Sequence, residues 1–210
     1  EAQLLTTYHD ERYAAARENL AVTEATIRFM VPPNLPRRLL RAVLLRLSHP
    51  FQSARDRVNS GRMAEPYVYA ESPLVEPGQS SPLAGHFAPD GWVRTPRGRQ
   101  RLRTLFGTDF TLLLWTDDRD SPGDWNGVAP AVVPLRVVAV LPPGARPNAG
   151  AVSAEDVTLR DAYGMRGGGW TLVRPDGHVA ASAIGPADPA RTATLLRRCA
   201  RSRTTADVLD

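Results

Sequence analysis

The sequence contains no lysine, and all 26 basic residues among its 210 residues are arginine. It also contains a single cysteine, Cys199, which excludes an intramolecular disulfide, a cysteine-cluster metal site and dithiol redox chemistry. No apolar run approaches the roughly 20 residues that a membrane-spanning helix needs. Because a lone thiol suits a reducing compartment, we predict a cytoplasmic protein with no membrane partner.

A glycine-rich turn from a strand into a helix, the element that binds the pyrophosphate of a dinucleotide, is missing as well. The nearest candidate, Gly167-Gly168-Gly169, precedes a predicted strand. Its amides would not converge at a helix N-terminus, so we interpret it as a flexible connection. The sequence therefore predicts no cofactor-binding residue in this chain.

Positive charge is modest overall, with a formal net charge of +4 at pH 7, but it is locally concentrated. Five arginines fall close together at Arg94, Arg97, Arg99, Arg101 and Arg103. Such a run could contact phosphates, so a nucleic-acid-binding module is one alternative. Only Trp92 stands nearby to stack on bases, and we therefore favour a solvated loop over a nucleic-acid partner.

Candidate catalytic and metal-binding residues lack visible partners. Residues 9–11 (His-Asp-Glu) are adjacent on a predicted helix and point in different directions, so we interpret them as a solvated face. His178 is expected to be an exposed hairpin residue, and His49 and His86 lie beside chain-breaking residues. Cys199 falls on the apolar side of a predicted helix and is interpreted as a small buried residue. The sequence predicts no catalytic or metal site.

The N-terminal part of the chain is predicted to be helical. Residues 3–30 place apolar side chains at helical spacings, and Pro32-Pro33 ends this helix. Asn34 is a suitable N-cap for a second helix, which stops at His49-Pro50. Its apolar stripe consists of Leu39, Leu40, Val43, Leu44 and Leu47. Residues 67–70 then predict a short strand.

Strand signals dominate the second half of the chain. Residues 110–115 (FTLLLW) and 135–141 (LRVVAVL) are nearly continuous apolar runs, typical of strands buried on both faces. Residues 170–173 and 178–184 predict a hairpin, and Asp188-Pro189 is expected to open a last helix. We place a domain boundary between Gln79 and Pro82, which separates residues 1–80 from an α/β domain of residues 81–210.

Short motifs in conserved order resemble the phenol and chlorophenol hydroxylase family, which includes many aromatic polyketide hydroxylases. The N-terminal match is LLTTYHDERYAAARENL at 4–20, with Tyr8, Glu11 and Arg12, followed by YVYAESPL at 67–74. The later matches are APDGWV at 88–93, RLRTLFGTDFTLL at 101–113, LRVVAV at 135–140, LRDAYG at 159–164 and WTLVRPDGHVA at 170–180.

This resemblance implies a thioredoxin-like C-terminal domain preceded by a helical segment. It implies FAD- and NAD(P)H-dependent hydroxylation of an aromatic compound for the parent protein, with the remainder of that flavoprotein as partner. The chain begins at Glu1 in helical register, which we interpret as an internal start. We expect the chain itself to be non-catalytic, with a structural or oligomerisation role such as homodimer formation.

Two departures from a thioredoxin domain stand out. No Cys-x-x-Cys follows the first strand, and residues 116–134 contain prolines and glycines where the first helix of the fold is expected, so that helix is predicted to be short or missing. A free-standing thioredoxin-like interaction domain, docking through its sheet edge or the 37–47 helix, remains an alternative.

Overall fold

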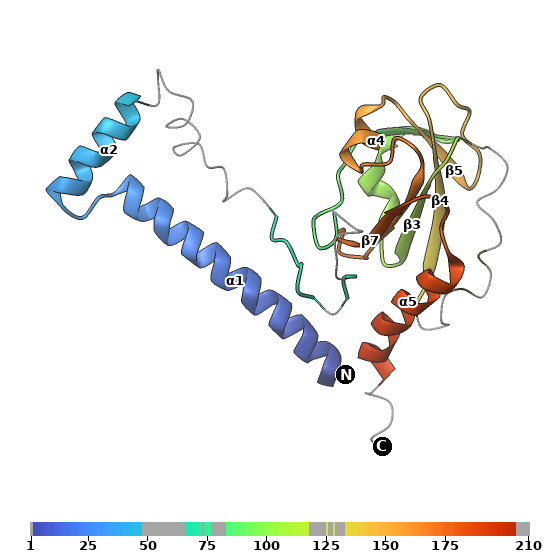
Figure 1. Cartoon of the computed structure of the whole chain (residues 1–210), viewed down its shortest axis with the longest axis horizontal. Helices are drawn as coiled ribbons and strands as arrows, with labels where there is room; N and C mark the ends of the chain where they lie inside the picture. Colours follow the sequence, from blue (N-terminus) through green and yellow to red (C-terminus); the bar gives the residue numbers. More distant parts are fainter. Residues whose placement is uncertain are drawn as a thin grey trace. The chain divides into compact units, whose positions relative to one another are not determined.

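The computed structural model describes residues 2–47, 66–72, 74–76, 83–117, 125, 128 and 133–204 (Figure 1). The chain divides into two compact units, His9–Tyr67 and Val68–Asp210 together with Glu1–Tyr8. The boundary expected between Gln79 and Pro82 lies outside the described residues. Among the described helices, none is both long and apolar enough to cross a membrane.

Both predicted N-terminal helices are confirmed. Helix α1 spans Ala2–Met30 and α2 spans Leu35–Leu47, on either side of the Pro32-Pro33 pair. The Asn34 side-chain oxygen accepts a hydrogen bond from the backbone N–H of Arg37 at 3.2 Å, as expected for an N-cap. Arg41 donates from α2 to the Met30 carbonyl at the end of α1, at 2.9 Å.

The strand predicted at residues 67–70 is wrong. This segment is irregular and enters a turn at Ala70, because the Ser72 N–H donates back to the Tyr69 carbonyl at 3.2 Å. The Tyr69 N–H donates to the Gly85 carbonyl of another segment at 2.9 Å. The turn therefore keeps this segment from continuing as a strand.

The second unit is built on one seven-stranded mixed sheet of order β2-β1-β5-β4-β3-β6-β7. Strand β3 is parallel to β4, and β4 is parallel to β5, whereas the remaining neighbours are antiparallel. The strands are β1 (Trp92–Thr95), β2 (Gly98–Arg101), β3 (Phe110–Trp115), β4 (Leu135–Leu141), β5 (Ala151–Ala154), β6 (Gly169–Val173) and β7 (Val179–Ile184).

Four of these strands form the thioredoxin-like core that was predicted. Parallel β4 and β3 lie beside antiparallel β6 and β7, and helices α4 (Thr158–Ala162) and α5 (Pro189–Thr204) precede β6 and follow β7. Pro189 is the first residue of α5, and the Asp188 carboxylate accepts from the Ala190 N–H at 2.8 Å. Most of the connection between β3 and β4, where a short or missing helix was predicted, lies outside the described residues.

The sheet buries apolar side chains on both faces, as the runs in β3 and β4 predicted. On one face, Leu113 and Trp115 of β3 pack with residues from α4 and the 3-10 helix η1 (Leu102–Leu105). On the other face, Leu112 and Leu114 pack with residues from α5. Helices α4 and α5 therefore cover opposite faces of the same sheet (Figure 1).

Candidate functional site

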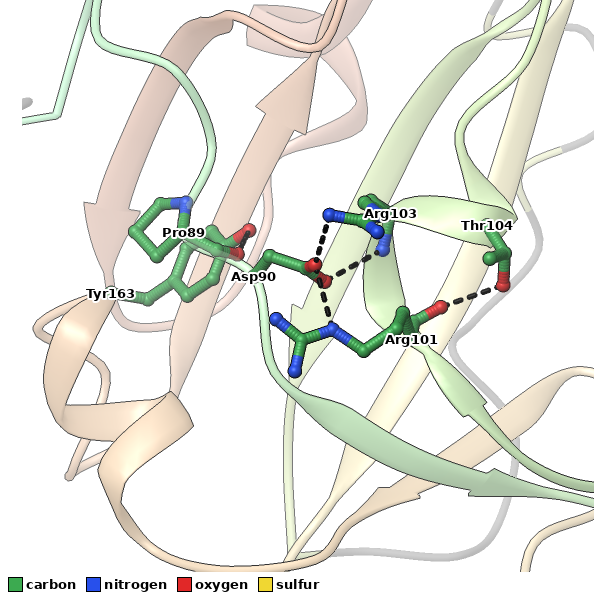
Figure 2. A network of polar contacts seen from close by, with 6 residues as sticks. All are labelled: Pro89, Asp90, Arg101, Arg103, Thr104 and Tyr163. Carbon is green, nitrogen blue, oxygen red and sulfur yellow. Dashed lines mark hydrogen bonds and ion pairs between the residues drawn. The ribbon is translucent and has the colours of Figure 1, made fainter. Parts of the chain in front are cut away.

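Three of the motifs that carry the family resemblance meet at Asp90. Asp90 itself lies just before β1, Arg101 ends β2, and Arg103 lies on η1. Tyr163 directly follows α4. Figure 2 shows these side chains close together. Asp90 and Tyr163 are 73 residues apart in the sequence.

The Asp90 carboxylate, which is 14% exposed, accepts hydrogen bonds from two neighbouring segments (Figure 2). One oxygen accepts from Nε of Arg101 at 2.9 Å and lies 3.4 Å from Nη1 of Arg103. The other oxygen accepts from the backbone N–H of Arg103 at 3.1 Å. Charge-assisted bonds of this kind contribute roughly 1.5–3 kcal/mol each, so the carboxylate firmly joins the start of β1 to η1.

Tyr163 attaches α4 to the same place. Its hydroxyl donates to the Pro89 carbonyl at 2.7 Å, and its ring packs on Trp115 with ring centroids 4.6 Å apart. Burial raises the pKa of the Tyr163 phenol well above its usual value, and the Asp90 charge raises it further. Tyr163 is therefore a neutral hydrogen-bond donor at physiological pH.

This network resembles a structural brace more than a reaction centre. Both oxygens of the Asp90 carboxylate are engaged, and the Tyr163 proton is committed to a backbone carbonyl. Asp90 and Tyr163 were not predicted as site residues, and Arg101 and Arg103 were predicted only as part of an arginine run, because partners separated along the chain leave no local periodic signal.

The same motifs lie inside the region recognised by a family model. That model, described as aromatic-ring hydroxylase, C-terminal, matches residues 81–202. The chain belongs to the aromatic-ring hydroxylase family. A Streptomyces coelicolor protein named polyketide hydroxylase is 40% identical over 112 residues, which make up 50% of this chain and 17% of that protein.

Two solved structures of relatives share the fold. Aklavinone-11 hydroxylase, in a ternary complex with FAD and aklavinone, matches 94% of this chain and 35% of its own with 26% identity and a TM-score of 0.63. The rebeccamycin biosynthetic enzyme RebC with reduced flavin matches 92% of this chain and 36% of its own, with 26% identity and a TM-score of 0.57. This chain thus spans about a third of the length of these relatives.

The glycine cluster of this hydroxylase family member does not fit a flavin dinucleotide. Gly168, at φ +84°, donates its N–H to the Met165 carbonyl at 3.1 Å, and Gly169 is the first residue of β6, one residue before the predicted start of that strand. A Cβ at Gly169 would lie 2.5 Å from the Ala183 carbonyl oxygen. The glycines therefore serve a tight turn and close strand packing, and their amides do not converge at a helix N-terminus.

The prediction of an exposed His178 is wrong. Its side chain is 12% exposed and makes edge-to-face contacts with Tyr69 and Phe87, at centroid distances of 4.7 and 5.3 Å. Gly177, at φ +86°, turns the chain at the hairpin and lets the Phe87 ring approach closely. His178 Nδ1 lies 3.4 Å from Asp176, in a cluster that holds the hairpin turn against neighbouring segments.

The other candidates are not assembled into a site. His9 is exposed and stacks on Tyr13 with ring centroids 5.9 Å apart, and His86 is exposed. His49 and the side chains of Asp10 and Cys199 lie outside the described residues. In the part of the chain that the structure describes, no three His, Cys, Asp or Glu side chains are grouped as metal ligands.

The arginine run is a β-hairpin and a 3-10 turn, so the prediction of a solvated loop is wrong. Arg99 and Arg101 lie over the Trp92 ring, with guanidinium carbons 3.9 and 5.1 Å from its centroid. Arg99 also donates to Glu155 at 2.8 Å, and this hydrogen bond lowers the pKa of the Glu155 carboxyl. The arginine run therefore forms part of the sheet. Arg99 and Arg101 also contact the Trp92 ring, which could otherwise have stacked on a base.

Proposed function

We propose that this chain forms a non-catalytic C-terminal part of an FAD- and NAD(P)H-dependent aromatic-compound monooxygenase, with a structural or oligomerisation role in the cytoplasm. The observation that carries the proposal is the Asp90 network, which uses the family's motif residues to brace the fold. The single cysteine of the sequence agrees with a reducing compartment.

The solved relatives support the assignment of chemistry to a longer protein. The titles of two of them name FAD with aklavinone and reduced flavin, and this chain corresponds to 35% and 36% of their lengths. Within the described residues, the one glycine cluster is used for packing. We therefore assign flavin binding and hydroxylation to the whole hydroxylase. For this chain we propose a structural role within it.

Helix α2 supports the remainder of the flavoprotein as the partner. None of its residues is buried, and Leu39, Leu40 and Val43 are 68%, 59% and 52% exposed. A row of exposed aliphatic side chains on one helix is typical of a surface that another segment covers. We propose that the flavin-containing part of the hydroxylase covers it, and that the isolated chain covers it by self-association.

Nucleic acid binding is the less supported alternative, because the Trp92 ring is already covered by Arg99 and Arg101. Failure of the chain to bind heparin at low salt would remove that alternative. A flavin-binding sequence in the reading frame directly upstream of Glu1 would favour the hydroxylase. Its absence would favour a free-standing thioredoxin-like interaction domain.

A direct test is titration of FAD into the chain while flavin fluorescence is followed. We expect no saturable quenching at micromolar concentrations and no phenol-dependent oxidation of NAD(P)H, because the described glycine cluster offers no preorganised amides to the pyrophosphate. Stoichiometric FAD binding would contradict the assignment of a non-catalytic role.

A further inference from the structure

A cleft of about 540 Å³ opens at the end of the sheet where the interior strands β4 and β5 begin. Its walls are the turn of the β1–β2 hairpin, the end of η1, and the first residues of β4 and β5. The Ala139 N–H of β4 donates to the Gly150 carbonyl at 3.0 Å, which fixes the loop that leads into β5. This hydrogen bond holds one wall of the cleft to β4.

Two arginines line this cleft from different walls. Arg97 lies in the hairpin turn, and within the described part of the chain its guanidinium has no hydrogen-bond or ion-pair partner. Arg136 lies on β4 and donates Nη1 to the Leu105 carbonyl at 3.1 Å, a neutral acceptor that leaves its charge uncompensated. Each guanidinium retains N–H groups that can bind an oxyanion.

The remaining polar groups of the cleft also favour an anion. None of its described lining residues is Asp or Glu. Gln100 adds a side-chain amide, and Asn148 uses its carbonyl oxygen to accept from the Gly150 N–H at 2.9 Å, which leaves its NH₂ group as a donor. Of the five arginines in residues 90–105, four pair with Asp90 or Glu155, and Arg97 has no carboxylate partner among the described residues, so its charge is available to an anion.

We propose that this cleft binds a small polyanion, holding a carboxylate or phosphate group between Arg97 and Arg136. Guanidinium groups match both oxyanions with paired N–H donors. The volume suits a small molecule, since ligand pockets typically measure about 300–1,000 Å³. The site lies on the sheet unit alone and does not depend on flavin, so its test is independent of the proposed hydroxylase role.

The test is isothermal titration calorimetry of the whole chain with inorganic pyrophosphate and, separately, with citrate, at low ionic strength. We expect saturable binding of at least one probe, with a dissociation constant of about 0.1–1 mM. Arg97→Gln and Arg136→Gln should each weaken it about tenfold by removing a charge-assisted contact. Binding of pyrophosphate alone would identify a phosphate site, and binding of citrate alone a carboxylate site.

The matched control is Arg197→Gln, at an exposed arginine of α5 that does not line the cleft. It lowers the net charge by one, as both cleft variants do, and should leave affinity within about twofold of the unmodified chain. The Arg97 guanidinium has no hydrogen-bond or ion-pair partner among the described residues, so its replacement should not disturb folding. Equal weakening by all three variants, or no saturable binding of either probe, would overturn the proposal.

Discussion

At the scale of single residues, the Asp90 carboxylate binds side chains and backbone from separate segments. Its two oxygens are shared between Arg101 and Arg103, and Tyr163 binds the carbonyl of the preceding residue, Pro89. The cost of removing such a group includes the donors that lose their acceptor, as well as the lost hydrogen bonds. The effect should therefore exceed that of an exposed ion pair.

We expect Asp90→Asn to lower the free energy of unfolding by about 1–3 kcal/mol, because the amide cannot accept from both arginines with a full charge. Urea denaturation followed by tryptophan fluorescence would measure the change. The matched control is Asp161→Asn, whose carboxylate pairs with the highly exposed Arg166 and should matter little. Equal effects of the two substitutions would show that the Asp90 network is not a brace.

A second residue-scale prediction concerns Asp176. Burial by itself raises the pKa of this carboxyl, but the hydrogen bond with His178 and the charge of Arg174 outweigh it and hold the pKa below its usual value. The ion pair with Arg174 measures 2.8 Å. A depressed folded-state pKa gives stability that is present above the unfolded value of about 3.9 and is lost as the pH falls through the folded value.

We therefore expect Asp176→Asn to be less stable than the unmodified chain at pH 7, with the two free energies of unfolding converging between about pH 4 and pH 2. Denaturant titrations at a series of pH values would measure both curves. A difference that stays constant across this range would mean that the carboxylate charge does not contribute.

At the scale of elements, whether a helix or strand could be predicted from the sequence depended on the burial pattern of its residues. Strands β3 and β4 were predicted because their apolar runs are buried on both faces, and α5 because Asp188 and Pro189 mark its start. The β1–β2 hairpin was missed since Val93 is the only buried residue in it and arginines interrupt the alternation. Strand β5 and helix α4 were missed because they are short. Strand β5 has four small residues, and α4 has only five residues.

The site was harder to predict than the fold for a related reason. The Asp90 network depends on tertiary pairing of β1 with β2 and β5, and the sequence analysis had identified neither β1, β2 nor β5 as a strand. His178 was misjudged likewise, because the segments that cover it, at Tyr69 and Phe87, lie far from it in sequence. Local patterns carry no information on such contacts.

The linker segment, residues 68–72 and 74–76, belongs to the sheet unit. The Glu76 N–H donates to Ala180 of β7 at 2.8 Å, and the Glu76 carboxylate accepts two hydrogen bonds from Arg191, at 3.0 and 2.7 Å. Tyr69 is buried against His178 and the Arg174 guanidinium. This segment therefore contributes to the stability of a sheet whose strands begin only at residue 92.

We expect Tyr69→Ala to lower the free energy of unfolding by about 2–4 kcal/mol, through loss of a buried aromatic side chain and its ring contacts. The same substitution at the exposed Tyr13 of α1 is the matched control and should change the unfolding of the sheet unit little. Thermal and urea denaturation would measure both. A Tyr69→Ala variant as stable as Tyr13→Ala would show that the linker segment does not stabilise the sheet unit.

At the scale of the whole molecule, the two units differ in how far they bury their apolar side chains. The sheet unit buries large residues on both faces between β-strands and helices. Helix α2 has no buried residue, and α1 leaves Leu20, Ile27 and Met30 exposed. The relatives are about three times longer, so a protein of their length would supply further surface to cover these helices.

Isolated in solution, the chain should therefore associate through α2 or exchange its amides rapidly there. Sedimentation equilibrium should detect association that Leu40→Glu weakens, because a charge placed in the apolar stripe must stay hydrated. Thr194→Glu, which adds the same charge at an exposed position of α5, should leave association unchanged. If the chain is instead monomeric, hydrogen exchange in α2 should be much faster than in β3, since α2 lacks buried contacts. A monomer in which α2 is as protected as β3 would refute the prediction that these helices need a partner.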